Sequence, residues 1–276
     1  MTFKDLPGNL IRLLISMLIA AVALMPIVWG LLSSFKTPQD ILRTVPQWLP
    51  NTFTWQNYAS IFKAGTGGYI FNSVLVSGGT VAVCLALGSI AGYGLARFEF
   101  AGKRAVTVAI IAVMSIPVAS LLIPTYTMMA EAGLVNTRTG LILVYSAYQL
   151  PIVIWIMATY YQTLPEELEW SALIDGYTRT QTLTKIVLPL AKPALIAATL
   201  FVLTFAWNDF VVAVTLLSSD TVRTLPIGIY NFLGFYGREW GPLLAASMVS
   251  IVPLVALFVV LQRFFVAGMT GGGVKG

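Results

Sequence analysis

Long runs with almost no charge are the feature that most constrains this chain. Six runs are long enough for the roughly 20 residues that an α-helix needs to cross a bilayer. They are Leu13–Phe35, Ala64–Ala96, Ala105–Ala130, Thr139–Pro165, Pro193–Ser219 and Trp240–Gln262. With 58% hydrophobic and 10% charged residues, a water-soluble domain has too little polar surface to cover its apolar residues. The sequence therefore predicts an all-α integral membrane protein with six transmembrane helices. The first run is too long for the core of a signal peptide, so we expect a retained anchor.

The distribution of basic residues predicts the orientation in the membrane. Six spans place both termini on one side, and ten of the 16 Lys and Arg residues then lie on that side. Because cytoplasmic segments are enriched in Lys and Arg, we expect both termini in the cytoplasm and the chain in the inner membrane. The net charge of +5 is explained by attraction to anionic lipid and requires no nucleic acid.

Several kinds of chemistry lack the residues that they need. The chain contains no histidine and a single cysteine, Cys84. A disulfide within the chain, a Cys/His metal site and a histidine general base are therefore excluded. The Gly-x-x-x-x-Gly-Lys-Ser/Thr loop that cradles nucleotide phosphates is also missing. We expect no cofactor or metal in this chain and no enzymatic activity.

The most heavily charged segment of the second half is residues 164–190, which we expect to lie in the cytoplasm as two short helices. Pro165 suits a first helical turn, and the acids after it favour a helix N-terminus. Gly176 can end that helix in a left-handed conformation. Thr178 or Thr180 can cap the second helix. An amphipathic loop lying on the membrane is the alternative, and the turn at 175–180 is the exposed tip in both cases.

Asp209, beside Trp207 and Asn208, is the only acid within a predicted span. A carboxylate there costs about 2.5–3.5 kcal/mol on insertion scales, so such a residue usually faces a polar path or a partner. The competing interpretations place Asp209 at the bilayer edge or in a structural pair.

Two other patterns predict how the spans are shaped. The third span contains Pro117 and Pro124 and is expected to be kinked. The second carries small residues at helical spacing, which allow close packing of helices in lipid. These residues are Gly78, Gly79, Ala82, Ala86, Ser89 and Gly92.

The cytoplasmic segment resembles the coupling loop of the permease subunits of binding-protein-dependent ABC importers. That loop reads Glu-Ala-Ala, three residues, Gly, nine residues, Ile-x-Leu-Pro. Gly176 and the run Ile186-Val187-Leu188-Pro189 keep the spacing, and Ala172 matches the second alanine. Ser171 replaces the first alanine. Trp170 stands at the glutamate position and Glu169 precedes it, which removes the usual glutamate contact or shifts it to Glu169.

The resemblance extends over residues 53–276. It includes Asn57-Tyr58, Gly133-Leu134-Val135-Asn136-Thr137, Trp207-Asn208-Asp209-Phe210 and Arg223-Thr224-Leu225-Pro226. The glycine-rich ending resembles that of the smaller permease in maltose-type carbohydrate importers. The chain is thereby identified as similar to a type I ABC importer permease with a cytoplasmic coupling helix.

The resemblance implies a single permease domain over residues 1–276, a coupling loop at 164–190 and a C-terminal tail at 266–276 that reaches the ATPase. It also implies assembly with a homologous permease, two ATPase subunits that bind ATP, and an extracytoplasmic binding protein that delivers a carbohydrate. A polyol or glycerol phosphate remains an alternative solute, and a secondary transporter is a weaker alternative because only Asp209 would supply a coupling charge. The residues assigned to ATPase coupling are Glu169, Ala172, Asp175, Gly176, Tyr177, Thr178 and Arg179. Those assigned to the substrate path are Trp207, Asn208 and Asp209.

Overall fold

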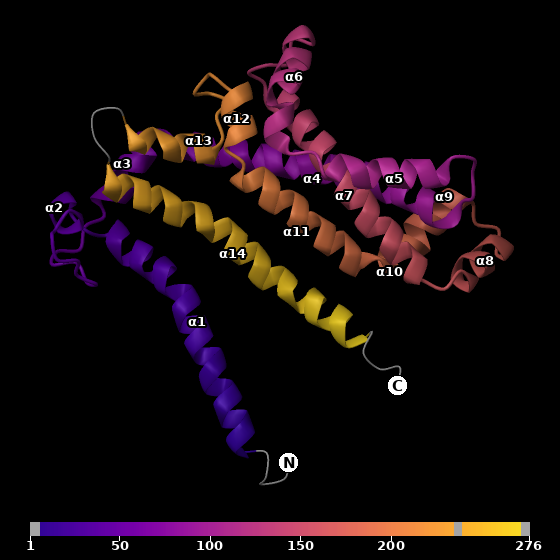
Figure 1. Cartoon of the computed structure of the whole chain (residues 1–276), viewed down its shortest axis with the longest axis horizontal. Helices are drawn as coiled ribbons and strands as arrows, with labels where there is room; N and C mark the ends of the chain where they lie inside the picture. Colours follow the sequence, from indigo (N-terminus) through magenta and orange to yellow (C-terminus); the bar gives the residue numbers. More distant parts are fainter. Residues whose placement is uncertain (1–5, 235–238, 272–276) are drawn as a thin grey trace. The chain divides into compact units, whose positions relative to one another are not determined.

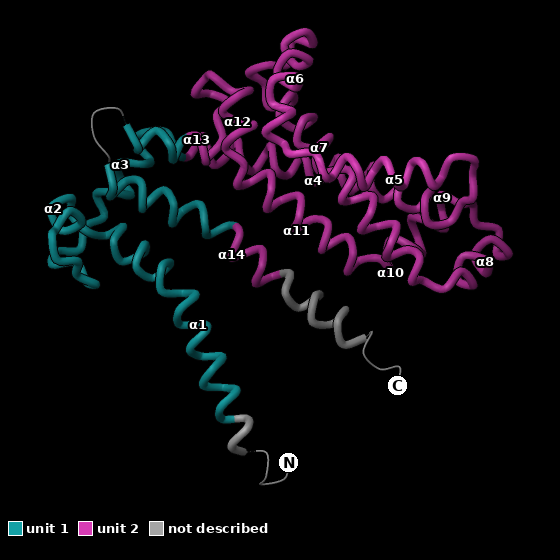
Figure 2. Tube along the Cα trace, viewed as in Figure 1, with its two compact units in different colours: residues 1–66, 228–253 teal, residues 67–227, 254–276 magenta. Residues whose placement is uncertain are grey.

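A computed structural model describes residues 6–234 and 239–271, and these residues form helices and connecting turns without a strand (Figure 1). The chain divides into two compact units (Figure 2). Unit 1 comprises residues 1–66 and 228–253, and unit 2 comprises residues 67–227 and 254–276. Each unit is described by itself.

Unit 1 contains helices α1 (Leu6–Ser34), α2 (Pro38–Ile41) and α3 (Gln56–Lys63), a short turn of 3-10 helix (Asn231–Leu233) and the first part of α14 (Trp240–Gly271). Its small core consists of Ile61, Phe232, Ala245 and Ala246. The buried amide of Asn57 joins two elements by donating hydrogen bonds to the carbonyls of Ser34 (2.8 Å) and Lys36 (2.9 Å).

Lys36 follows α1 and is itself buried in unit 1. Its ammonium group donates to the carbonyl oxygen of Gln47 and lies 4.2 Å from the centroid of the Trp29 ring. Burial lowers the pKa of Lys36, and the nearby carboxylate of Asp40 opposes that shift. These contacts hold the segment after α1 against the end of that helix.

Unit 2 holds most of the remaining helices. They are α4 (Thr66–Arg97), α5 (Lys103–Met114), α6 (Val118–Glu131), α7 (Arg138–Thr163), α8 (Glu167–Ile174), α9 (Arg179–Thr182), a π-helical turn (Leu183–Val187), α10 (Leu188–Leu190), α11 (Lys192–Asn208) and α12 (Val211–Leu216). Helix α13 (Leu225–Tyr230) crosses the boundary between the units. Within unit 2, α7 packs against both α5 and α11 (Figure 1).

Helices α4 and α7 approach closely because α4 presents glycines to α7. A Cβ atom added to Gly92 would lie 2.8 Å from Cβ of Met157 and 3.1 Å from the carbonyl oxygen of Ile154. Gly79 likewise faces Ile142. The prediction that small residues in this span allow close packing is confirmed for these two positions, whereas Gly78 faces open space.

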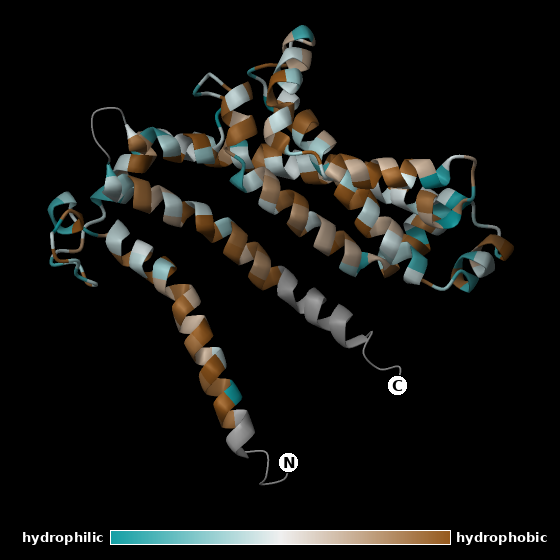
Figure 3. Ribbon diagram, viewed as in Figure 1, coloured by the Kyte–Doolittle hydropathy of each residue, from teal (hydrophilic) through white to brown (hydrophobic). Residues whose placement is uncertain are grey.

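The all-α membrane architecture is confirmed. Among the described residues, four helices are long and apolar enough to span a bilayer, and the number reaches six if each of two bent helix pairs counts as one span. Hydrophobic residues run along most of α1 and along the coloured part of α14 (Figure 3). One bent pair is α5 with α6, which meet at 101°. The break falls before Pro117, as a proline kink predicts, but Pro124 lies inside α6 without ending it.

The fifth uncharged run, 193–219, is not one continuous helix. Helix α11 ends at Asn208, Asp209 is extended with ψ of 127°, and α12 then begins at Val211. The other bent pair joins residues 179–190 to α11 at 79°. Helix α14 continues to Gly271 and so includes the first residues of the predicted C-terminal tail, 266–276. Residues 272–276 of that predicted tail lie outside the described residues.

Candidate functional site

The predicted cytoplasmic element is present as two helices joined by a tight turn. Helix α8 starts at Glu167 with Glu166 at its N-cap, so Pro165 precedes the helix and does not form its first turn. The positive φ of Gly176 (89°) ends this helix and reverses the chain. Only glycine adopts that conformation without strain, which explains why a glycine stands at this position.

Thr178 starts the second helix through a capping box. Its Oγ1 accepts a hydrogen bond from the backbone N–H of Gln181 (3.3 Å), and the side-chain oxygen of Gln181 accepts one from the N–H of Thr178 (2.8 Å). Of the two threonines that the sequence offered, the cap is therefore Thr178. The cap fixes the geometry of the turn from its C-terminal side.

The seven residues predicted to couple to an ATPase divide into two groups. Residues 175–179 are all exposed and form the tip. Glu169 and Ala172, by contrast, are only 3% and 2% exposed and face the interior of unit 2. The outer side of α8 instead carries apolar residues, with Trp170 57% and Ile174 86% exposed. An exposed apolar surface beside a rigid turn is typical of a surface that binds another protein.

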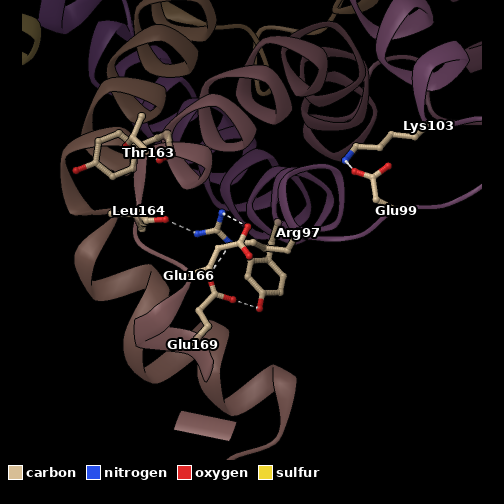
Figure 4. Close-up of polar contacts among 9 residues, drawn as sticks. Arg97, Glu99, Lys103, Thr163, Leu164, Glu166 and Glu169 are labelled. Carbon is tan, nitrogen blue, oxygen red and sulfur yellow. Dashed lines mark hydrogen bonds and ion pairs between the residues drawn. The ribbon is translucent and has the colours of Figure 1, made fainter. Parts of the chain in front are cut away.

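Glu169 is held by a buried polar cluster at the end of α4 (Figure 4). One carboxylate oxygen accepts a 2.7 Å hydrogen bond from Nε of Arg97, and the other accepts a 2.6 Å hydrogen bond from the hydroxyl of Tyr93. A second guanidinium nitrogen of Arg97 donates to the carbonyl of Leu164 at 2.9 Å. The side chains of Arg97 and Glu169 are 6% and 4% exposed. Breaking such a pair by removing one partner costs about 3–5 kcal/mol.

Sequence reasoning named Glu169 but missed its partners, because Arg97 and Tyr93 lie 72 and 76 residues earlier in the chain. The neighbouring pair Lys103–Glu99 differs in kind, since the Glu99 side chain is 88% exposed. It is also local, joining residues four apart. Of these two ion pairs, the one between Arg97 and Glu169 joins the coupling element (residues 164–190) to a membrane helix.

Arg179 links the tip to the loop that follows α4. Its guanidinium carbon lies 5.8 Å from the ring centroid of Phe98 and 5.9 Å from that of Trp170. Both distances fall within the range of cation–π attraction. Trp170 stands where the coupling-loop pattern has glutamate, and its ring provides an aromatic surface against which the guanidinium of Arg179 lies.

The second helix of the element continues through a π-helical turn at 183–187 into α10. Leu188 donates its backbone N–H to the carbonyl of Leu183, a wider spacing than in an α-helix. Pro189 follows at once, and proline has no N–H to donate. Pro189 lies within α10, and the chain turns at Ala191, where the 79° bend into α11 lies.

The three residues predicted to line a substrate path have different surroundings. Trp207 is 2% exposed and packs inside unit 2. Asp209 accepts hydrogen bonds from the hydroxyl of Tyr145 and from the backbone N–H groups of Val212 and Ala213. It therefore caps α12 and joins it to α7. Asn208 is exposed, and its amide donates to the carbonyl of Thr204 in its own helix.

Asn208 also faces a groove of about 820 Å³ within unit 2. Two further polar side chains, Gln149 and Thr204, line the same groove among apolar residues. The complete lining consists of Gln149, Leu200, Phe201, Thr204, Phe205, Asn208, Leu254, Val255, Leu257 and Phe258. Among the described residues, no cluster of three or more His, Cys, Asp or Glu side chains could hold a metal ion.

The chain is similar in sequence and fold to several known proteins. The model of the family described as "Binding-protein-dependent transport system inner membrane component" matches residues 84–271. The sulfoquinovosyl glycerol transport system permease protein SmoH of Agrobacterium fabrum is 33% identical over 270 residues, covering 98% of this chain and 95% of the relative. The trehalose/maltose transport system permease protein MalG of Thermococcus litoralis is 32% identical over 265 residues, covering 95% of each chain.

Two further similarities concern sequence and fold. The arabinooligosaccharides transport system permease protein AraQ of Halalkalibacterium halodurans is 37% identical over 262 residues, covering 94% of this chain and 93% of the relative. In a crystal structure of a bacterial ABC transporter involved in the import of alginate, one chain superposes with a TM-score of 0.81 at 21% identity, covering 96% of this chain and 99% of that one. The structural similarity establishes a shared fold.

Proposed function

This chain belongs to the family of inner-membrane components of binding-protein-dependent transport systems, and we propose that the solute it helps to import is a carbohydrate. It is a multi-pass permease subunit of an ABC importer, which works with a substrate-binding protein and ATPase subunits. The carbohydrate assignment is supported by relatives at 32–37% identity whose names specify sulfoquinovosyl glycerol, trehalose or maltose, and arabinooligosaccharides.

The coupling element is proposed to dock into an ATPase subunit through its exposed tip. The exposed run 175–179 supports this, together with the apolar side chains of Trp170 and Ile174 on the same element. ATP would be bound by the ATPase subunits, and this chain would contribute no cofactor site. Because Glu169 and Ala172 are buried, their proposed role is to hold the element in place while the tip makes the contact.

The substrate path is proposed to run along the groove that Asn208 faces. Gln149, Thr204 and Asn208 supply amide and hydroxyl groups that can hydrogen-bond to sugar hydroxyls. Phe201, Phe205 and Phe258 line the same groove, and their aromatic faces can pack against the apolar side of a sugar ring. The carboxylate of Asp209 would act as a structural anchor, because it accepts hydrogen bonds from Tyr145 and from two backbone N–H groups of α12. This assignment keeps Asn208 in the path and favours the structural interpretation of Asp209.

A second, homologous permease is proposed to complete the path. Residues 10–28 of α1 are all exposed within this chain, so other molecules, lipid or protein, must cover them. Both termini are proposed to lie in the cytoplasm, which places the coupling tip on the side where ATP is available. Import then requires that solute and ATP each bind the inward-facing and outward-facing states with different affinity.

The proposal is tested by uptake into vesicles that contain this chain with its partner permease, the ATPase and the binding protein. A panel of labelled trehalose, maltose, an arabinooligosaccharide, a polyol and glycerol phosphate should give ATP-dependent uptake of a carbohydrate. Uptake of the polyol or glycerol phosphate alone would exclude the carbohydrate assignment while leaving the importer assignment intact.

A further inference from the structure

The buried cluster around Glu169 connects two parts of unit 2 that have different roles in the proposed function. Glu169 belongs to α8 of the coupling element, whereas Arg97 and Tyr93 lie in the last turns of the membrane helix α4. Both carboxylate oxygens are satisfied, at 2.7 Å by Arg97 and at 2.6 Å by Tyr93. The contacts are shielded from water, so they are screened far less than surface ion pairs.

The geometry points to Arg97 and Tyr93 as positioning residues that make the end of α4 and the coupling helix move as one body. Arg97 contributes twice, because it also binds the carbonyl of Leu164 in the chain entering α8 (2.9 Å). Because the guanidinium group binds at both points, it fixes the orientation of α8 relative to the end of α4 as well as their separation. A displacement of the tip by an ATPase would then pass to α4 through Glu169. The inference rests on the proposed docking of the tip.

Two features of the structure argue for a transmitting role over simple stabilisation. First, α4 packs on α7 without side-chain padding at Gly92, which lies immediately before Tyr93 and five residues before Arg97 in the same helix. Motion of the end of α4 is therefore passed directly to a second membrane helix. Second, Tyr93 also packs edge-on against Tyr161 of α7, with ring centroids 5.9 Å apart. The cluster thus joins the coupling helix to two membrane helices at once.

The test compares three variants in the complete transporter: Glu169→Gln, Tyr93→Phe, and Glu99→Gln as a matched control in the exposed ion pair. ATPase co-purification, ATP hydrolysis and uptake are measured together. We expect Glu169→Gln to keep its ATPase and hydrolyse ATP, while solute transported per ATP falls about tenfold, within the usual range of coupling between sites. Tyr93→Phe, which removes one hydrogen bond and keeps the ring, should show a smaller fall in the same ratio. Glu99→Gln should match the wild type.

A second measurement uses the full chain alone and does not depend on transport. With Cys84 replaced by serine, spin labels are placed at the exposed positions Ile90 of α4 and Ser171 of α8. The distance distribution between the labels should broaden in Tyr93→Phe and Glu169→Gln and stay narrow in Glu99→Gln. If Glu169→Gln does not fold, Tyr93→Phe decides alone.

The inference is overturned if both variants keep the wild-type distance distribution and the wild-type ratio. It is equally overturned if Glu169→Gln loses its ATPase with the label distances unchanged, because Glu169 would then be a docking residue. Failure of the proposed function looks different: the wild-type chain would neither bind an ATPase nor transport, whatever the labels report.

Discussion

The hydroxyl of Tyr145 in α7 donates a hydrogen bond of 2.8 Å to the carboxylate of Asp209, at the point where α11 ends and α12 begins. Tyr145 is fully buried, and the same carboxylate oxygen accepts the N–H groups of Val212 and Ala213 at 3.1 Å each. The one acid in a predicted span therefore stabilises the junction at which α11 ends and α12 begins. Asn208, its immediate neighbour, donates to the carbonyl of Thr204 in its own helix and lines the groove.

The first prediction separates these two neighbours. Asp209→Ala removes the cap of α12 and the Tyr145 bond and should lower the stability of the complex by about 1–2 kcal/mol, the usual cost of losing such a cap. Asp209→Asn keeps an acceptor oxygen and should be milder. Asn208→Ala should leave thermal stability unchanged but alter uptake or solute preference. Melting temperature and uptake distinguish the residues, and a stable Asp209→Ala with altered preference would reverse their roles.

The second prediction concerns the contact between α4 and α7. Gly92→Ala would place a methyl group within about 3 Å of Met157 and Ala158 and should destabilise the protein by about 1–3 kcal/mol through overpacking. Gly94→Ala is the matched control, because nothing lies within 4 Å of its added Cβ. It should be neutral or stabilising by about 0.5–1 kcal/mol, since alanine favours helix over glycine. Thermal unfolding in detergent measures both, and equal melting temperatures would contradict the packing argument.

Much of this fold follows from local sequence signals. Uncharged length predicts the spans, Pro117 predicts the break in the third, and Gly176 and Thr178 predict the turn and cap of the coupling element. Each of these signals acts over a few residues. The break at Asp209 was missed because an acid in an apolar run indicates a polar environment without saying whether a helix ends there.

What the sequence could not indicate depends on contacts between distant residues. Glu169 looks like a surface acid in a charged segment, and only its proximity to Arg97 and Tyr93 makes it a buried one. The same applies to Asn208, whose place in a groove depends on Gln149 from another helix. The coupling residues were therefore found by pattern, while their division into a buried pair and an exposed tip required the structure.

The third prediction uses two glycines with the same backbone conformation. Gly176 and Gly102 have φ of 89° and 87°, and an added Cβ at either position meets nothing within 4 Å. Alanine at each should therefore cause similar backbone strain, about 1–2 kcal/mol. Only Gly176→Ala should reduce ATPase association or uncouple hydrolysis, because only that turn is proposed to dock. Equal coupling in the two variants, measured as solute per ATP, would contradict docking at the tip.

The fourth prediction is the orientation in the membrane. In a Cys84→Ser background, a single cysteine at Thr178 should react with an impermeant thiol reagent only from the cytoplasmic side. One at Ser219, in the loop after α12, should react only from outside. Labelling in intact cells and in inverted vesicles measures both, and reaction of Thr178 from outside would reverse the proposed topology.

The central claim is that this permease imports a carbohydrate only when an ATPase drives it through the tip of the coupling element. The most direct measurement is sugar uptake into vesicles containing the complete transporter, with and without ATP, compared between wild type and Gly176→Ala. The account predicts ATP-dependent uptake that requires both the ATPase and the binding protein and that falls in the variant while the permease stays in the membrane. Uptake that proceeds without ATP, or that an ion gradient drives in the absence of the ATPase, would contradict it.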